Sequence, residues 1–430
     1  MTYSAILRIK PFRDLWLGQA ISQLGDAFYY VVFMYMVERL TGSIAMVGVV
    51  GGLETLPFLL FGPHAGILAD RIDRRKIMLL SDLVSGATLA MLAAYLLFDS
   101  KPPLALLLIT PFMLSSVRVF FMPAKSAAVP ALVPVEHVQK ANAFSMVTQS
   151  FMPIIGLSLS ATVLGILYDQ TPRWFFFTAV LINALSFFGS AVYIARLPKI
   201  LPEREDIHEV RPMTDFKEGM RFIGRRHDLL VLMALLTVFR FMVAPFFVVY
   251  VAANKQWFGG KPQPLAWFEL AFFVGMIIAS FIVGALSLKK PGLCFSMALA
   301  VVGVAVGMLG AFPSFWLFIL WNTVAGLAVP FGDIPIGTYM QLSVPDAFRG
   351  RVNSVIQMIS TGVMPISMGL AGLLVAGVGV VWCFYLMGAG MMLAALVPLL
   401  DPVYRRIEMP EMDTAPKVEE EPEPVHALVL

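Results

Sequence analysis

The stretch "GILADRIDRRKIMLL", residues 66–80, decides the fold because it places a cluster of charged residues between two long apolar segments. Six of the seven residues from Asp70 to Lys76 are charged. The apolar runs on both sides are longer than the helices of a soluble core. The stretch therefore predicts a short polar loop between two membrane-spanning segments.

Composition extends this interpretation to the whole chain. The 430 residues are 59% hydrophobic and only 14% charged, whereas soluble domains are roughly 25% charged. Apolar runs of this length satisfy their backbone groups in lipid only as helices or as a closed barrel, and no run alternates with a period of two. We therefore expect an all-α polytopic membrane protein. The two cysteines, Cys294 and Cys383, lie in apolar runs, which excludes a disulfide framework.

The apolar runs and the polar segments that separate them predict twelve membrane spans. Their expected ranges are 15–38, 44–68, 77–98, 104–124, 142–168, 174–195, 229–253, 265–287, 292–311, 314–341, 353–377 and 380–400. One long polar insert separates the sixth span from the seventh and ends as an amphipathic segment, expected to lie on the membrane surface. The predicted units are a six-helix bundle at 1–196, a cytoplasmic linker at 197–228, a second bundle at 229–400 and a disordered acidic tail at 401–430.

The distribution of Lys and Arg predicts the orientation. With the N-terminus placed inside, 24 of the 31 basic residues fall on the inner side and five on the outer side. Cytoplasmic loops carry the excess of positive charge. We therefore expect both termini in the cytoplasm and the chain in the plasma (inner) membrane. The first apolar run is longer than a signal-peptide core, so we expect it to be retained as a span.

An internal repeat predicts a duplicated six-helix unit. "VPVEHVQKANAF" (133–144) and "VPDAFRGRVNSV" (344–355) align without gaps, and each precedes the fifth span of its half. Such a duplication places a substrate site between the halves, near the middle of the bilayer. The alignment matches Pro134 with Pro345, Lys140 with Arg351 and Asn142 with Asn353.

These motifs carry a family resemblance. "GILADRIDRRKIML" resembles the loop signature between the second and third spans of the major facilitator superfamily. Together with "FRDLWLGQAISQLGDAF" (12–28), "PAKSAAVPALVP" (123–134) and the 344–355 motif, it makes the chain similar end to end to the branch of macrolide-efflux and enterobactin-exporter-like proteins. The resemblance implies two pseudo-symmetric bundles of six helices that alternate access to a central cavity.

The resemblance also implies a cytoplasmic gate. The aspartate matching Asp70 holds the outward-open state by facing the start of span eleven, near Asn353. The arginines matching Arg71 and Arg74 brace neighbouring helices, and Gly66 begins the motif. Asp73 departs from the pattern because the superfamily has a glycine at this position.

Ionisable residues inside spans are candidates for transport, because each costs roughly 2.5 to 3.5 kcal/mol to insert. Asp26 is the leading candidate, since it shares one helical stripe with Gln19, Gln23 and Tyr30. The candidates for proton coupling and translocation are Asp26, Glu54, Arg118, Arg240, Glu269 and Asp333.

Two interpretations of these groups remain open. Arg118, at a depth where the resembled branch has a fourth-span arginine, is expected to pair with Asp26 or Glu54, either in a proton-carrying site or in a static ion pair. Asp333 is preferred to Glu269 as a translocation residue, because Pro330 and Pro335 are expected to break its helix. Glu269 is expected near the membrane interface.

The remaining polar candidates predict the walls of a cavity. Thirty-four Phe and 26 Met favour a large, mostly apolar cavity for amphipathic ligands. The predicted polar wall residues are Asn142, Gln149, Asn353 and Gln357, beside Gln19, Gln23 and Tyr30.

The expected function is proton-coupled export of small hydrophobic or amphipathic molecules such as drugs. No HExxH, GxSxG or P-loop motif is present, so we expect no enzyme activity, cofactor or metal, and an ion gradient as the energy source. The expected partners are substrate, protons and the lipid bilayer, without nucleic acid, and the expected unit is a monomer. A siderophore exporter, a lysophospholipid or lipid flipping facilitator, and a non-transporting scaffold or receptor remain alternatives.

Overall fold

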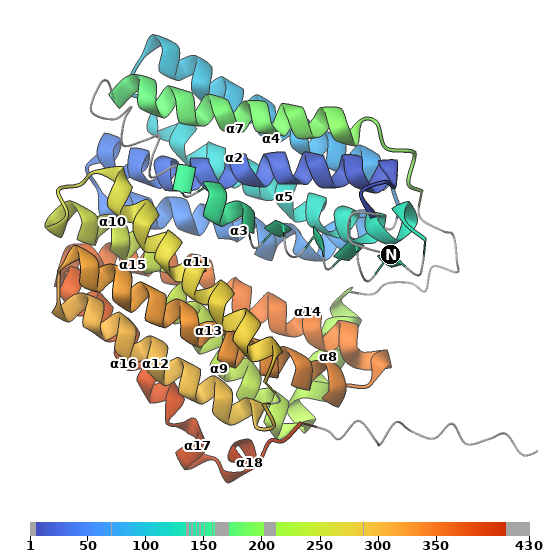
Figure 1. The fold of residues 1–430 in the computed structure, drawn as a ribbon, viewed down its shortest axis with the longest axis vertical. Helices are drawn as coiled ribbons and strands as arrows, with labels where there is room; N and C mark the ends of the chain where they lie inside the picture. Colours follow the sequence, from blue (N-terminus) through green and yellow to red (C-terminus); the bar gives the residue numbers. More distant parts are fainter. Residues whose placement is uncertain are drawn as a thin grey trace, which may run out of the picture.

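The computed structural model describes residues 6–69, 71–134, 137–138, 141–142, 144–145, 148–149, 151–156, 158–159, 172–201, 212–286 and 288–409. Across these residues the chain is helical, and its long helices run side by side in two groups (Figure 1). This confirms the predicted all-α fold class. Asp70, much of the predicted span 142–168, part of the linker and the tail from residue 410 lie outside the described residues.

The N-terminal half is built around α2. This helix packs along α7, while α4 packs between α7 and α5, and α3 packs against α5. The described long helices of this half are α2 (Lys10–Thr41), α3 (Ile44–Ala69), α4 (Arg74–Phe98), α5 (Leu104–Leu132) and α7 (Pro172–Ile194).

The C-terminal half repeats this packing, with α13 lying between α11 and α12, and α16 lying along α12. Two four-residue helices, α17 (Val397–Leu400) and α18 (Pro402–Arg405), end the described chain. The other helices are α8 (Pro212–Arg225), α9 (His227–Val243), α10 (Phe246–Trp257), α11 (Pro262–Gly284), α12 (Pro291–Ala311), α13 (Phe315–Ser343), α14 (Asp346–Gly362), α15 (Met364–Val378) and α16 (Val380–Ala395).

The count of twelve spans is only partly confirmed. Ten helical segments of the described chain are long and apolar enough to cross a membrane, and α16 is a shorter apolar helix. Two of these segments each consist of two helices: α9 and α10 meet at Pro245, and α14 and α15 meet just before Pro365. Proline lacks the N–H that would continue a helix.

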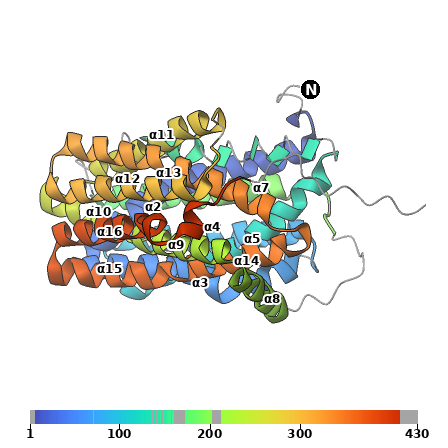
Figure 2. The same ribbon diagram turned by 90° about the horizontal axis from the view of Figure 1, so that it is seen from below.

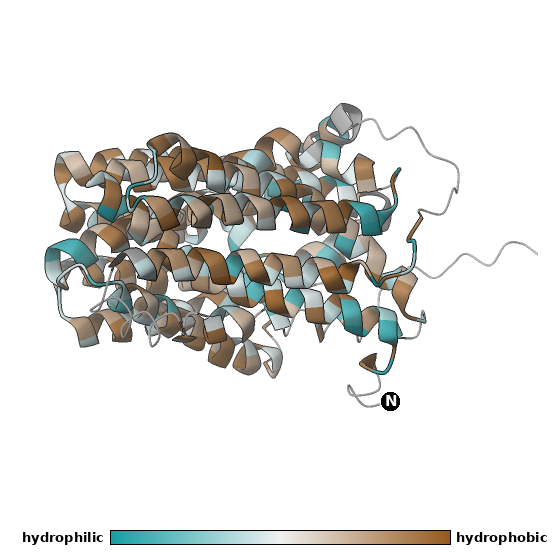
Figure 3. Cartoon of the chain, turned by 90° about the horizontal axis from the view of Figure 1, so that it is seen from above, coloured by the Kyte–Doolittle hydropathy of each residue, from teal (hydrophilic) through white to brown (hydrophobic). Residues whose placement is uncertain are grey.

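The outer surface of the bundle is apolar. Phe281, Trp316 and Leu393 are 72%, 76% and 69% exposed, and apolar residues dominate the sides of the bundle in Figure 3, with polar ones near its two ends. Soluble monomers rarely expose an apolar surface of this extent. The sides of the molecule are therefore suited to a lipid environment.

The two ends of the molecule differ in charge. The loop of Arg71, Arg74 and Arg75 lies at the end of the molecule where α2 and α9 begin, and Lys289 lies at the same end. We call this end the basic end. The other end, where α2 and α10 finish, is called the opposite end.

The two halves touch near the opposite end, where α3 runs beside α15 (Figure 2). A Cβ atom built on Gly48 would lie 2.5 Å from the backbone oxygen of Met368, and one on Gly372 would lie 2.7 Å from the Cα of Ala45. Both positions require glycine, since any side chain would push the helices apart.

The charged loop of the opening motif is held by side-chain to backbone hydrogen bonds. Asp73 caps α4 by accepting the N–H of Arg75 at 3.1 Å, and it also accepts the N–H of Ile200 at 3.0 Å. Arg74 donates to the backbone oxygens of Ala127 and Ala69. The aspartate that departs from the superfamily pattern is thus a helix cap, which is a common role for this residue type.

The amphipathic helix α8 corrects one expectation. Its apolar face packs on α14, where the Phe222 ring stacks on the Phe348 ring at 4.9 Å and Ile223 is fully buried. Glu218 pairs with Arg351 of α14 at 2.8 Å. The sequence placed this face on the membrane surface, but protein covers it, because α14 presents a complementary apolar face.

Candidate functional site

The central feature of the structure is a cavity of about 830 Å³ between the two halves. Drug-sized ligands occupy pockets of about 300 to 1,000 Å³ with mostly apolar walls. Helices α2, α3, α4 and α5 of one half and α9, α10, α11 and α13 of the other supply most of the lining. The cavity therefore has the size and composition of a small-molecule site.

The polar stripe of α2 lies along this cavity. Gln19, Gln23, Asp26 and Tyr30 all line it. The amide Nδ2 of Asn183 in α7 donates to Asp26 Oδ1 at 3.3 Å. The sequence analysis did not single out Asn183, whose polar side chain inside an apolar span was the available signal.

Glu54 and Arg118 face the same part of the cavity. Ser115 of α5 donates to the backbone oxygen of Glu54, which ties α5 to α3. The charge of Arg118 acts on both Asp26 and Glu54. Among the described residues no ion pair shorter than 4.0 Å joins Arg118 to either carboxylate, so the three groups form an open cluster around one arginine.

Of the three C-terminal candidates, the structure brings Glu269 to the cavity but not Asp333, which the sequence analysis preferred, or Arg240. Glu269 lines the cavity seven residues after the start of α11, a depth of about 10 Å. Its side chain lines the cavity, and its expected place near the membrane interface stays a prediction. Asp333 and Arg240 are exposed and are not part of the lining, although the charge of Arg240 acts on Asp333.

The expected break in the helix of Asp333 is also wrong. Pro330 and Pro335 both lie inside α13, which is continuous over 29 residues. Neighbouring helices can accommodate prolines within a membrane helix.

The predicted polar walls of the repeat-matched spans are only partly brought to the cavity. Gln149 lines the cavity, as do Pro153 and Met364. Asn142, Asn353 and Gln357 are exposed and do not line it.

At the gate motif, Arg74 makes the helix-bracing contacts described above, and Arg71 is exposed. A Cβ on Gly66 would meet no atom within 4 Å. Asp70 lies outside the described residues, and the helix it was expected to face begins at Asp346 rather than near Asn353.

Two charged residues of the cavity were missed. Asp82 of α4 is 2% exposed, and Lys125 of α5 is 7% exposed, and both line the cavity. Asp82 lies inside the predicted span 77–98, so its charge was an available signal. Lys125 falls just outside the predicted span 104–124, but α5 continues through its prolines to Leu132 and includes it.

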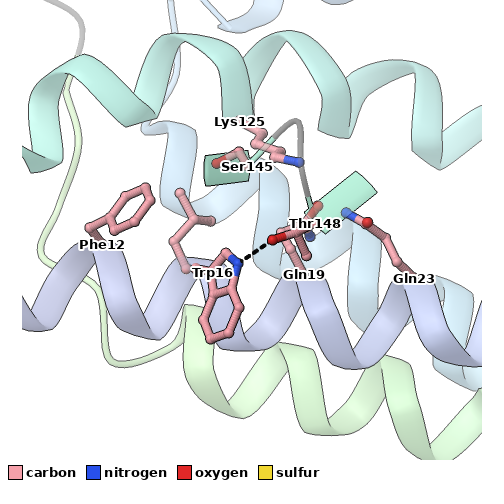
Figure 4. A pocket seen from close by; sticks show the side chains of 8 residues that line it. Phe12, Trp16, Gln19, Gln23, Lys125, Ser145 and Thr148 are labelled. Carbon is pink, nitrogen blue, oxygen red and sulfur yellow. Dashed lines mark hydrogen bonds between the residues drawn. The ribbon is translucent and has the colours of Figure 1, made fainter. Parts of the chain in front are cut away.

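Lys125 also links the cavity to a small side pocket of about 10 Å³, the space that one water molecule occupies. Gln19 and Gln23 line both spaces. Figure 4 shows these side chains around the pocket, where the indole N–H of Trp16 donates to Thr148 Oγ1 at 2.7 Å. Gln19, Gln23 and Lys125 are thus shared between the cavity and the side pocket.

The described residues contain no group of three or more His, Cys, Asp or Glu side chains arranged to hold a metal ion.

Comparison with known proteins agrees with this architecture. A family model described as "Transmembrane secretion effector" matches residues 1–429. The chain is 27% identical over 407 residues to macrolide efflux protein A of Streptococcus pyogenes, covering 93% of this chain and 97% of that protein. It is 24% identical over 415 residues to the multidrug efflux pump Tap of Mycobacterium tuberculosis (strain CDC 1551 / Oshkosh), covering 92% and 93%.

Solved structures show the same fold. A bacterial homologue of the iron transporter ferroportin in an inward-facing state superposes with a TM-score of 0.71 at 16% identity, covering 92% of this chain and 98% of that chain. The nucleoside transporter NupG superposes with a TM-score of 0.68 at 12% identity, covering 92% and 99%. With the whole-chain family match, these findings show that the chain belongs to the transmembrane secretion effector family, a family of membrane transporters within the major facilitator superfamily.

Proposed function

We propose that this transporter exports small hydrophobic or amphipathic molecules in exchange for protons. The observation that carries the proposal is the cavity in which two carboxylates, Asp26 and Glu54, share the single charge of Arg118. The names of the macrolide and multidrug efflux relatives support the direction of transport and the class of substrate.

The cluster has the chemistry of a proton carrier. One arginine balances only one of the two carboxylates, so the second is stabilised by taking up a proton or by water. Asp26 lies on α2, Glu54 on α3 and Arg118 on α5. A movement of these helices changes the distance from Arg118 to each carboxylate and thereby changes how tightly the proton is held.

The packing of the halves supports alternating access. Close approaches between the halves run from Leu59 with Gly362 to Ala45 with Gly372, along the part of α3 away from the basic end. Because positive charge favours the cytoplasmic side, we assign the basic end, with both termini, to the cytoplasm. In this assignment the structure corresponds to a state closed toward the outside. We also propose that the chain acts as a monomer in the inner membrane.

The energy of the proton gradient is sufficient for uphill export. A proton moving inward gains roughly 2.3 kcal/mol per 100 mV of membrane potential, and a pH difference adds to this. In this scheme the proton reaches Asp26 or Glu54 from the outside and leaves toward the basic end, past Gln23, Gln19 and Lys125.

The test is transport in proteoliposomes with an imposed pH gradient, using a radiolabelled macrolide and a fluorescent amphiphile as probes. We expect Asp26→Asn and Glu54→Gln to abolish gradient-driven accumulation while the probes still bind. The control is Asp99→Asn, an exposed carboxylate at the opposite end, which should transport normally. Full coupling in both cavity variants would overturn the proposal, and movement of a fluorescent lysolipid in place of the two probes would favour the lipid-flipping alternative.

A further inference from the structure

The two walls of the cavity differ in their ionisable groups. The N-terminal wall carries Asp26, Glu54, Asp82, Arg118 and Lys125. Among the residues that line the C-terminal wall, Glu269 is the one charged side chain. The N-terminal wall therefore holds cations among its carboxylates, whereas a single carboxylate stands on the C-terminal wall.

Glu269 lacks a counter-charge within the described part of the chain. No lysine, arginine or histidine nitrogen of that part lies within 4.0 Å of its carboxylate, and no hydrogen bond to it is formed there. The charge of Arg118 acts mainly on Asp26 and Glu54, and no described cation acts comparably on Glu269. A carboxylate withdrawn from water without a cation is unfavourable, so this position gains from a ligand that brings a positive charge.

The surroundings of Glu269 are aromatic. Its charge acts on the hydroxyl groups of Tyr30 and Tyr250, which line the same space. The Tyr30 ring lies 4.8 Å from the Phe247 ring, so the aromatic surface continues from α2 to α10. Phe272 and Phe273 follow Glu269 on α11 at the spacing that places side chains on neighbouring positions of one helix face.

Aromatic faces around a carboxylate form a site of recognisable chemistry. Ring faces attract ammonium and other organic cations, most strongly where water is displaced. The carboxylate supplies the full opposite charge, and the rings contact the alkyl or aryl groups of the cation. A neutral ligand of the same size gains the ring contacts only.

We propose that Glu269, with Tyr30, Tyr250 and the phenylalanines beside it, forms a cation-binding subsite, so that the preferred substrates are lipophilic amines and related organic cations. This proposal rests on the transport function proposed above, and it assigns a different role to each half of the transporter. Asp26 and Glu54 take up and release the proton beside the fixed charge of Arg118, whereas Glu269 selects the substrate.

The first experiment measures binding to the purified full chain by fluorescence polarisation with two dyes, cationic rhodamine 6G and neutral Nile red. We expect Glu269→Gln to raise the Kd of rhodamine 6G roughly tenfold or more, as for loss of a charged contact, and to change that of Nile red less than twofold. Glu269→Asp should restore most of the affinity for rhodamine 6G.

Matched variants in the other wall serve as controls. Asp26→Asn and Glu54→Gln should leave the ratio of the two Kd values within about threefold of the parent, because the positive charge of Arg118 stands near both carboxylates and opposes an incoming cation there. Unchanged Kd values for both dyes in Glu269→Gln, or an equal loss for both dyes, would overturn the proposal. An equal loss would indicate a structural role, and unchanged Kd values would place the cation elsewhere.

The second experiment separates this proposal from proton coupling. In proteoliposomes, Glu269→Gln should retain gradient-driven transport of neutral Nile red and lose that of rhodamine 6G. If Glu269 were the proton carrier, both dyes would lose coupling. If the parent chain transported neither dye with a gradient, the proposed function would fail, while the binding ratio would still decide whether Glu269 holds a cation.

Discussion

Lys255 of α10 and Glu38 of α2 join the two halves at the opposite end, with Nζ and Oε1 separated by 2.5 Å. Glu38 is 5% exposed, whereas about half of the Lys255 side chain is exposed. The pair lies near the ends of α2 and α10 that are away from the basic end. It therefore stabilises the state in which this end is closed.

We predict that Lys255→Met favours opening of this end more than Glu38→Gln does. Loss of Lys255 leaves a buried carboxylate without its cation, whereas Glu38→Gln removes the buried charge as well. A half-exposed pair contributes up to about 1 kcal/mol, which corresponds to about a fivefold change in population. The measurement is the distance between spin labels at Arg39 and Gln256, the exposed residues that follow Glu38 and Lys255 in the chain.

The double variant is the control for this prediction. Lys255→Met combined with Glu38→Gln should return the label distances toward those of Glu38→Gln alone, because no unpaired charge remains. Identical distance distributions in the parent and all three variants would show that the ion pair does not hold the end closed.

A second prediction concerns the close approach of α3 and α15. Gly372→Val should block closure and reduce transport by at least tenfold, because even a Cβ at this position would lie 2.7 Å from Ala45. The matched control is Gly369→Val, one turn earlier on α15, where an added Cβ meets no atom within 4 Å. Both variants should insert into the membrane equally, as judged by the amount of monodisperse protein. Normal transport by Gly372→Val would mean that the helices need not come this close.

The fold could be predicted largely from the sequence, because the physical constraint behind it is local. A chain segment in lipid must satisfy its own backbone groups, so apolar length alone marks a helix. Helix ends were less predictable. α5 runs eight residues past its expected end at 124 and carries Lys125 into the cavity, because the prolines of this helix do not end it.

The candidate site was predicted for α2 and less well elsewhere. The stripe of Gln19, Gln23 and Asp26 follows from the helical period, and the structure places all three along the cavity. The ranking of Asp333 above Glu269 could not be settled in this way. It depends on which face of α11 and α13 meets the other half, and that is fixed by packing between helices distant in sequence.

A third prediction tests the role of Asp73. Asp73→Ala should lower the Tm of the detergent-solubilised protein by a few degrees, because it removes the cap of α4 and leaves the buried N–H of Ile200 without an acceptor, together about 2 kcal/mol. Asp73→Asn keeps an acceptor oxygen and should lose less than half as much. Asp73→Gly, which restores the superfamily residue, should resemble the alanine variant. An unchanged Tm in all three variants would show that the cap adds nothing measurable.

The last prediction concerns the helices that end the described chain. Tyr404 of α18 is fully buried and donates its hydroxyl to the backbone oxygen of Gly292 at 2.7 Å, which docks α18 against the start of α12. Asp401 caps α18 by accepting the N–H groups of Val403 and Tyr404, and its Oδ2 lies 2.6 Å from Nε2 of His227.

Slight burial alone would raise the pKa of Asp401, but the N–H donors and His227 outweigh it and hold the pKa below its ordinary value of 3.8. A carboxyl whose pKa is lowered on docking stabilises the docked state above its ordinary pKa, and this contribution is lost as the pH falls through the lowered value. We therefore expect α18 to stay docked from neutral pH to about pH 4 and to loosen below it. A spin label at exposed Arg406 should become more mobile over that range.

The variant Asp401→Asn separates this titration from general acid unfolding. It cannot change charge, so the label at Arg406 should already be more mobile at pH 7 and should show a weaker response to acid. A label at exposed Leu393 on α16 reports the integrity of the bundle and should remain unchanged over the same range. Equal acid responses in the parent and in Asp401→Asn would assign the loosening to other groups, since the capping carboxylate would then make no difference to how α18 is held.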